Sequence, residues 1–338
     1  MYAATPWLTE RHGYDPTCFL IVTALLIIMT SLSAMKGSLE IGIVDLLQGI
    51  FTGGNEDVEV IKDLRFPRII IALFTGAALA VSGVLFQAVM KNPLADAGVI
   101  GISSGASFMT LVIITLFPQF FFWTPVFAFL GGAFACYLVY AFSWKSGLSP
   151  LRIILVGIAI NAMFTGLNES FITICGYFIK SIKQTTTSNI TMKTWGDVEI
   201  MVTYGTIGLI LALFVGAWCN LLTLQDKTAK NLGLHVTRVR LIISAIAVLL
   251  AAVSTAIAGV IAFVGLLVPH ISRQLVGSDH KVLIPFSALA GALLILTADT
   301  IGRLIVPPNE IPAATIMAVI GGPFLIFLLR KSDKVHGN

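Results

Sequence analysis

Residues 66–117, FPRIIIALFTGAALAVSGVLFQAVMKNPLADAGVIGISSGASFMTLVIITLF, decide the fold. Two apolar runs, 66–90 and 97–117, are separated only by the polar turn KNPLAD at 91–96. Each run is long enough to cross the hydrocarbon core of a bilayer as a helix, which takes about 20 residues. Two such helices joined by a turn this short predict a helical bundle that spans a membrane.

The rest of the chain repeats this pattern. Of its 338 residues, 57% are hydrophobic and only 11% are charged, whereas globular proteins carry about 25% charged residues. We predict an all-α polytopic membrane protein in which residues 1–338 form a single transmembrane domain of about ten helices. The candidate segments lie near residues 18–35, 66–90, 97–117, 124–143, 151–176, 201–222, 239–257, 258–275, 283–304 and 311–329. The eighth is expected to be broken or shortened, because Pro269, His270 and Arg273 interrupt it.

Composition and charge exclude several classes of protein. A net charge of +4 with no basic run argues against binding to nucleic acid. The five histidines and four cysteines show no metal-binding or redox spacing, and no Gly-Lys dipeptide is present from which a Walker A phosphate loop could be built. We therefore expect no metal site, no bound cofactor and no catalytic residue in this chain.

The distribution of Lys and Arg predicts the orientation in the membrane. With ten spans and a cytoplasmic N-terminus, most of the 21 basic residues fall in the inner loops. The polar start, MYAATPWLTERHGYDPT, does not resemble a removable signal peptide. The sequence therefore predicts that both termini are cytoplasmic.

Polar side chains inside the fifth segment form one candidate site. Asn161, Thr165 and Asn168 are spaced i, i+4 and i+7, so they share a helix face, with Glu169 and Thr173 nearby. Polar groups at membrane depth are costly and line hydrated paths, or they hydrogen-bond to neighbouring helices. The spacing leaves both interpretations open.

Charged residues also cluster at the predicted outer ends of two segments. Arg65 and Arg68 flank Pro67, which is placed to begin a helix. Such arginines anchor a helix at the membrane surface, or they form an outward fork suited to the carboxylates of a docking partner. Asp299 and Arg303, at i and i+4, are placed to form a local ion pair.

Two inner segments carry further signals. The turn Asn92-Pro93-Leu94 is either a simple reversal of the chain or a constriction. Residues 224–238 alternate apolar and charged side chains, which predicts a short amphipathic helix that Gly233 ends. A helix of this kind lies at the lipid headgroups or docks into a soluble partner.

Six blocks of sequence resemble the FecCD family of permease subunits, and the resemblance runs from about residue 36 to 330. They are LRFPR at 64–68, GAALAVSGVLFQAVMKNPLADAGVIGISSGA at 76–106, AKNLGL at 229–234, GVIAFVGLLVPHISRQLVGSDHKVLIP at 259–285, ADTIGR at 298–303 and EIPAATIMAVIGGP at 310–323. Such permeases serve type II ABC importers of ferric siderophores, haem and cobalamin. The resemblance implies a bundle like that of the cobalamin-importer permease, in a bacterial plasma membrane.

The same resemblance implies partners. The permease would pair with a second copy or a close paralogue, and the translocation path would run between the two. Two cytoplasmic ABC ATPase subunits and an extracytoplasmic substrate-binding lipoprotein would complete the complex. ATP and Mg would then be bound by the ATPase subunits and not by this chain.

Site roles carry over onto the positions that match the family's motifs. Docking to the binding protein is expected of Arg65, Arg68 and Arg303. The cytoplasmic gate is expected at Asn92, Pro93 and Leu94, with a second gate position at Ser149 and Pro150, where the chain departs from the small hydroxyl pair of the cobalamin permease. Coupling to the ATPase is expected of Asp226, Ala229, Leu232, Gly233 and Leu234.

The expected substrate is an iron complex. The stretches GGNEDVEVIKDLRFPR, TMKTWGDVEI and PPNEIPA look most like haem-uptake permeases of Gram-positive bacteria, so haem is expected, or else a ferric siderophore. The alternative is an ion-coupled secondary transporter, which would need an intramembrane relay of carboxylates, and only Glu169 and Asp299 lie near that depth. A membrane enzyme would need a paired nucleophile and base, which the sequence does not offer.

Overall fold

The described residues of this computed structural model are 16–36, 42, 56–98, 100–143, 150–176, 190–305 and 309–336. They form helices and no strand, which confirms the all-α prediction. The helices are α1 (Pro16–Met35), α3 (Glu56–Met90), α4 (Ile102–Leu116), α5 (Thr124–Ser143), α6 (Pro150–Gly176), α8 (Trp195–Phe214), α9 (Gly216–Thr223), α10 (Asp226–Asn231), α11 (Val236–Ala258), α12 (Val264–Val276), α13 (His280–Ile305) and α14 (Ala313–His336). A 3-10 helix, η2 (Pro118–Trp123), leads into α5.

Each of the ten predicted segments coincides with a helix, although they differ in length. Within the described ranges, seven helical stretches are long and apolar enough to cross a membrane, and two shorter apolar helices lie at Ile102–Leu116 and Ala313–Phe327. The sixth segment is divided into α8 and α9 at Val215. The eighth is shortened as expected, because the chain leaves the helix at Gly259 and α12 starts only at Val264.

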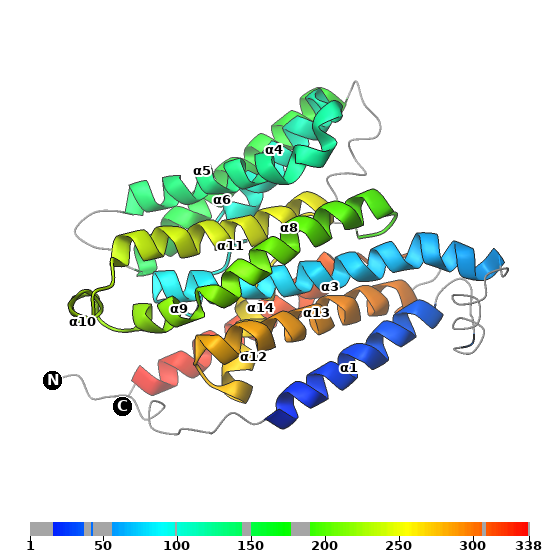
Figure 1. Cartoon of the computed structure of the whole chain (residues 1–338). Coiled ribbons are helices and arrows are strands. Elements are labelled where there is room, and N and C mark those ends of the chain that lie inside the picture. Colours follow the sequence, from blue (N-terminus) through cyan, green and yellow to red (C-terminus); the bar gives the residue numbers. More distant parts are fainter. Residues whose placement is uncertain are drawn as a thin grey trace.

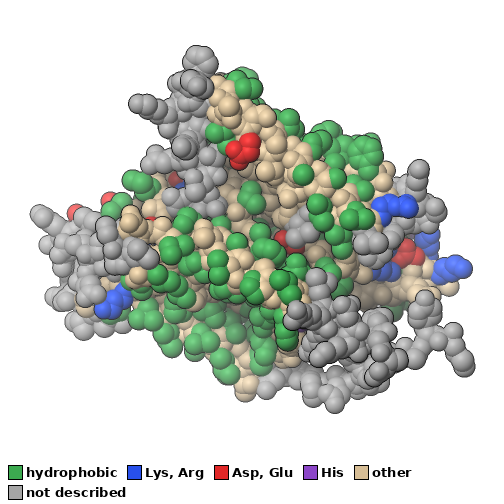
Figure 2. Space-filling view, turned by 180° about the vertical axis from the view of Figure 1, so that it is seen from behind, with side chains coloured by type: hydrophobic (Ala, Val, Ile, Leu, Met, Phe, Trp, Pro, Cys, Tyr) green, Lys and Arg blue, Asp and Glu red, His purple; other side chains and the backbone are tan. Residues whose placement is uncertain are grey.

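The helix α3 is the centre around which the bundle packs. It contacts α13, α11, α8 and α12, and Figure 1 shows α4, α5 and α6 on one side of this core, with α1 and α12 on the other. The membrane-spanning part of α3 is apolar on all sides, so it is stable when other helices surround it. Figure 2 shows hydrophobic side chains over the middle of one face, with most of the visible Lys and Arg toward its ends.

Glycines let these helices approach more closely than side chains would allow. A Cβ atom at Gly76 would lie 2.1 Å from the carbonyl oxygen of Gly291 on α13, and one at Gly83 would lie 2.0 Å from that of Gly265 on α12. Lipid tails are as apolar as the side chains, so close backbone packing of this kind holds membrane helices together.

Substitution of Gly76 by alanine is therefore expected to destabilise the bundle. The added methyl group overlaps the backbone of Gly291, and overpacking of this kind costs about 1–3 kcal/mol. The matched control is Gly196→Ala on α8, where the nearest atom would be the Thr194 hydroxyl at 3.6 Å. Thermal unfolding of the purified variants in detergent would measure the difference, and equal unfolding temperatures would contradict the prediction.

One boundary prediction is wrong. Pro67 was expected to begin a helix, but α3 starts at Glu56 and Pro67 lies inside it. The first turns of α3 carry charged residues and extend beyond the apolar run, so hydropathy gives no sign of them. This longer helix decides where Arg65 and Arg68 point.

Candidate functional site

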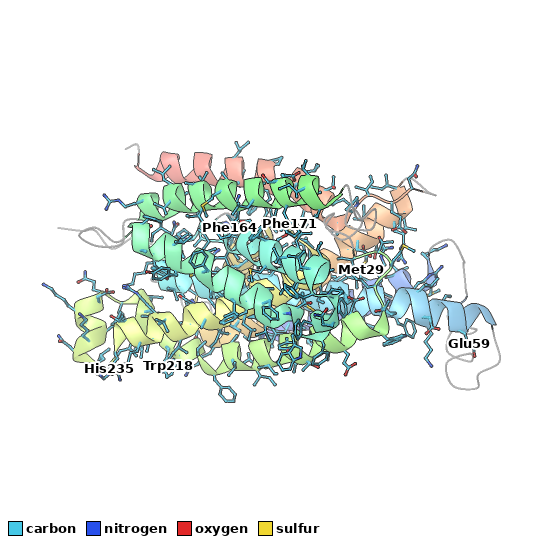
Figure 3. All side chains as sticks on the ribbon, turned by 90° about the horizontal axis from the view of Figure 1, so that it is seen from above. Met29, Glu59, Phe164, Phe171, Trp218 and His235 are labelled. Carbon is cyan, nitrogen blue, oxygen red and sulfur yellow. The ribbon has the colours of Figure 1, made fainter. Side chains whose placement is uncertain are left out.

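The candidate residues gather at the two ends of the bundle and along one helix. In Figure 3, Glu59 at the start of α3 lies at one end, while Trp218 and His235, from the chain around α10, lie at the opposite end. The arginine cluster belongs to the first end, and the turn at 91–94 belongs to the second, because Lys91 contacts Asp226 of α10.

Arg68 is held in an internal ion-pair network. Its Nε and Nη2 donate to the two carboxylate oxygens of Asp299 on α13, at 2.8 and 2.9 Å, and its Nη1 donates to Glu310 Oε2 at 2.8 Å. Arg68 and Asp299 are only 7% and 3% exposed. A bidentate pair of this geometry is strong and directional, so the network fixes α3 against α13 and the segment before α14.

Glu310 is the more exposed member of this network. It also accepts a hydrogen bond of 2.9 Å from the Thr191 hydroxyl. Burial alone would raise the pKa of Glu310, but the charge of Arg68 and the hydrogen bonds from Arg68 and Thr191 hold that pKa below its usual value. The carboxylate is therefore ionised at neutral pH, and it carries the negative charge nearest to solvent in the network.

The other two arginines hold the end of α1. Arg65 Nη1 donates to the Ala34 carbonyl at 2.8 Å, and Arg303 Nη2 donates to the carbonyl and hydroxyl oxygens of Ser33 at 2.8 and 3.0 Å. These contacts satisfy carbonyl groups that the helix end leaves without intrahelical partners. The three arginines thus lie together at one end of the bundle, as the sequence predicts.

Their orientation differs from the predicted outward fork. Arg65 and Arg68 are buried, because α3 begins earlier than expected and both residues lie several turns inside the helix, facing α1 and α13. The expected local ion pair between Asp299 and Arg303 is also replaced, since Asp299 pairs with Arg68. Docking through these arginines stays a prediction, and Glu310 is a participant that sequence reasoning missed.

The turn at 91–94 is built by local hydrogen bonds. The Leu94 amide donates to Asn92 Oδ1 at 3.0 Å, and Lys91 adopts a left-handed φ of 50°. Asn92 is buried, Pro93 is exposed and Leu94 is half-buried. This geometry is that of a capped chain reversal, and a gating role for the turn stays a prediction. The second gate position is not described, since Ser149 lies outside the described residues and only the backbone of Pro150, the first residue of α6, is placed.

The predicted amphipathic helix is present as α10. It covers Asp226–Asn231, and Gly233, with φ 83°, ends it in the left-handed conformation that the sequence predicts. The Leu234 amide donates to the Ala229 carbonyl at 3.1 Å, which closes the helix end. Ala229 is buried, whereas Leu232 is 63% exposed. An exposed leucine on a helix this small offers an apolar contact to another molecule.

A charge network joins α10 to the turn. Asp226 Oδ1 accepts from Lys91 Nζ and from Arg240 Nη2, both at 2.9 Å, and Lys91 Nζ also donates to the Leu224 carbonyl at 2.5 Å. Burial would raise the pKa of Asp226, but the hydrogen bond from Lys91 and the charges of Arg240 and Lys91 lower it. This network therefore links α10 directly to the turn at 91–94, a contact that spacing along the sequence could not reveal.

The predicted stripe on α6 is divided between two environments. Asn168 Nδ2 donates to the Ser104 carbonyl of α4 at 3.3 Å, and Asn161 is half-buried, whereas Thr165, Glu169 and Thr173 are exposed. Figure 3 labels Phe164 and Phe171, which lie near each other on the same helix, and Phe108 of α4 packs against both of their rings. Asn168 is therefore bonded between helices, as one of the two interpretations predicts, and a path lined by the exposed groups stays a prediction.

The described residues offer no evident binding site for a metal. No three His, Cys, Asp or Glu side chains among them are grouped to hold an ion. Asp299, one of the two carboxylates that an ion relay would use, is fully engaged by Arg68.

Comparison with known proteins agrees with this arrangement. The model of the FecCD transport family matches residues 25–331. The chain is 41% identical over 316 residues to the probable heme-iron transport system permease protein IsdF of Staphylococcus aureus strains RF122 and Newman, covering 94% of this chain and 96% of the relative.

Solved structures show the same fold. A metal-chelate type ABC transporter in an inward-facing conformation superposes with a TM-score of 0.76 at 30% identity, covering 94% of this chain and 99% of that one. PsaBC of Streptococcus pneumoniae, at 17% identity and a TM-score of 0.57, shares the fold. The helices, the ends of the bundle and these matches lead to one conclusion: the chain belongs to the FecCD transport family and is a membrane permease subunit.

Proposed function

We propose that this permease carries haem across the bacterial plasma membrane as one subunit of an ABC importer. The observation that carries the proposal is the exposed polar face of α6. This helix packs on α4 and α5, and leaves Thr165, Glu169 and Thr173 exposed in a membrane-spanning segment. The Thr173 hydroxyl is bonded to the Glu169 carbonyl, but lipid does not solvate the carboxylate of Glu169, so water or another subunit must contact that group.

A second permease subunit fits this face. Pairing of α6 with its counterpart would enclose the polar groups between the two chains and create the path that neither chain contains alone. The outer surface of α14 is apolar, with Val319 and Phe327 exposed, and it would extend the same interface. The partner would be a second copy or a close paralogue.

The two ends of the bundle would meet the other subunits. The exposed Leu232 and the short helix α10 would contact a cytoplasmic ABC ATPase subunit, which holds ATP and Mg, and the charge network at Asp226 would pass its movement to Asn92 and Leu94. An extracytoplasmic binding protein would dock at the arginine end. This orientation would place both termini in the cytoplasm, as the distribution of Lys and Arg predicts.

Haem is the substrate favoured by the relatives, which are named as probable heme-iron transport permeases. The test is uptake into vesicles that contain the permease, its ATPase and its binding protein, with haem and ferric siderophores in competition. We expect ATP-dependent accumulation of haem that a siderophore does not suppress. Uptake that follows an ion gradient without ATP would overturn the proposal in favour of a secondary transporter.

Docking at the arginine end makes a specific prediction for Glu310. Its carboxylate accepts the hydrogen bond from Nη1 of Arg68. A carboxylate of the binding protein that docks here would accept from the same nitrogen. Glu310→Gln removes the charge that competes for that donor, so it should tighten docking about three- to tenfold at low salt, a modest effect because the site is partly exposed.

The matched control is Glu199→Gln, an exposed acid on α8 that removes the same charge. Binding of the purified lipoprotein to the permease in nanodiscs would measure both affinities. Equal changes for the two variants would indicate a general effect of charge. Weaker docking of Glu310→Gln alone would show that Glu310 is a direct contact and would contradict the prediction.

A further inference from the structure

A groove of about 410 Å³ lies between α5 and α11, away from the face of α6. Its walls are mostly apolar and aromatic, with Phe129, Tyr137 and Tyr140 from α5 and Leu241 and Val248 from α11. Its volume falls in the range of about 300–1,000 Å³ that is typical of sites for small ligands. The groove is large enough to hold a molecule, and of the residues that line it only Arg240 belongs to the network at Asp226.

The groove opens on the surface that faces lipid. Tyr137 and Leu241 on its rim are 65% and 69% exposed, and Leu130 and Phe134 continue the exposed apolar surface of α5. Both helices are among those long and apolar enough to span the membrane. A molecule in this groove would therefore arrive from the bilayer and would present hydrocarbon to its walls.

One end of the groove is polar and cationic. Arg240 lies five residues into α11, about 6 Å along the axis from its first residue, which is the depth of the headgroups. Its Nη2 bonds Asp226, while its buried Nε makes no hydrogen bond. Tyr140 and Ser244 share a bond of 3.3 Å beside it. An anionic oxygen in the groove would supply the hydrogen-bond partner that this buried N–H lacks.

We propose that this groove binds one anionic phospholipid, with an acyl chain along the aromatic walls and the phosphate at Arg240. The charge supports this occupant, because Arg240 and Lys91 outnumber Asp226 at this end. Basic pockets between membrane helices on the cytoplasmic side recognise acidic headgroups. The lipid would bind next to the Asp226 network, so it would also steady α10.

The test measures which lipid the full-length permease retains. The permease and the subunits that co-purify with it are placed in nanodiscs of phosphatidylcholine and phosphatidylglycerol, and the retained lipid is identified by native mass spectrometry. We expect phosphatidylglycerol to be retained by the native protein and by Arg238→Gln, a neighbouring exposed arginine. Arg240→Gln should retain about fivefold less, the factor that one cationic group contributes. Ala245→Trp, which fills the groove and leaves Arg240 in place, should lose the lipid entirely.

Three results would overturn the proposal. The first is that Ala245→Trp still retains phosphatidylglycerol. The second is that Arg240→Gln retains as much phosphatidylglycerol as Arg238→Gln does. The third is that the native protein retains as much phosphatidylcholine as phosphatidylglycerol. A change of oligomeric state in Ala245→Trp would assign the groove to a second copy of the chain instead. Uptake is not the readout, so the outcome is independent of the proposed substrate.

Discussion

Asp299→Ala is expected to lower the free energy of unfolding by about 3 kcal/mol, near the lower end of the range for breaking a buried ion pair. The substitution removes both carboxylate oxygens that Arg68 contacts, and Arg68 is too deeply buried to recover water. Glu310 still accepts a hydrogen bond from Nη1 of Arg68, and this remaining contact limits the loss of stability. Thermal unfolding and gel filtration in detergent would measure it.

A second variant separates this structural role from docking. The double substitution Arg68→Met with Asp299→Leu removes both charges together, and buried pairs replaced by apolar side chains are often neutral or stabilising. We expect its unfolding temperature to return to the native value, while binding of the lipoprotein is lost if Arg68 is a docking group. If Asp299→Ala is as stable as the native protein, the ion pair does not form in the folded permease.

Much of the architecture follows from the sequence alone, because helices in lipid must be apolar for about 20 residues and satisfy their own backbone. All ten segments, the shortened helix after Gly259 and the αL residue Gly233 were predicted in this way. The start of α3 was not predicted. Its first turns are polar, and Pro67 lies inside the helix, where it removes one backbone hydrogen bond without ending the helix.

The sites were less predictable, since the contacts that define them join distant parts of the chain. Arg68 and Asp299 are 231 residues apart, and Lys91 and Asp226 are 135 residues apart. Spacing within one helix suggested a pair between Asp299 and Arg303 instead, because i, i+4 neighbours are the only partners a sequence displays. Tertiary packing of α3 against α13 decided the outcome.

Gly233→Val is expected to abolish coupled transport while ATP hydrolysis continues. Gly233 has φ 83°, and valine in that region is strained by about 1–2 kcal/mol or more. No atom lies within 4 Å of the position of its Cβ, so the penalty within this chain comes from the backbone and not from a clash. Relief of the strain would unwind the end of α10 and move Leu232, the exposed residue proposed to contact the ATPase.

The order of substitutions at this position identifies the cause. If backbone strain is responsible, Gly233→Asn should retain most uptake, because asparagine tolerates the left-handed conformation, and alanine should lie between asparagine and valine. If a side chain instead collides with the ATPase, alanine should be the mildest of the three. Haem uptake and ATP hydrolysis, measured on the same vesicles, give the ratio that reports coupling. If Gly233→Val couples ATP hydrolysis to uptake as well as the native protein does, the end of α10 is not part of the ATPase interface. The network of Lys91, Asp226 and Arg240 would then have to connect the gate to the ATPase through another part of the chain.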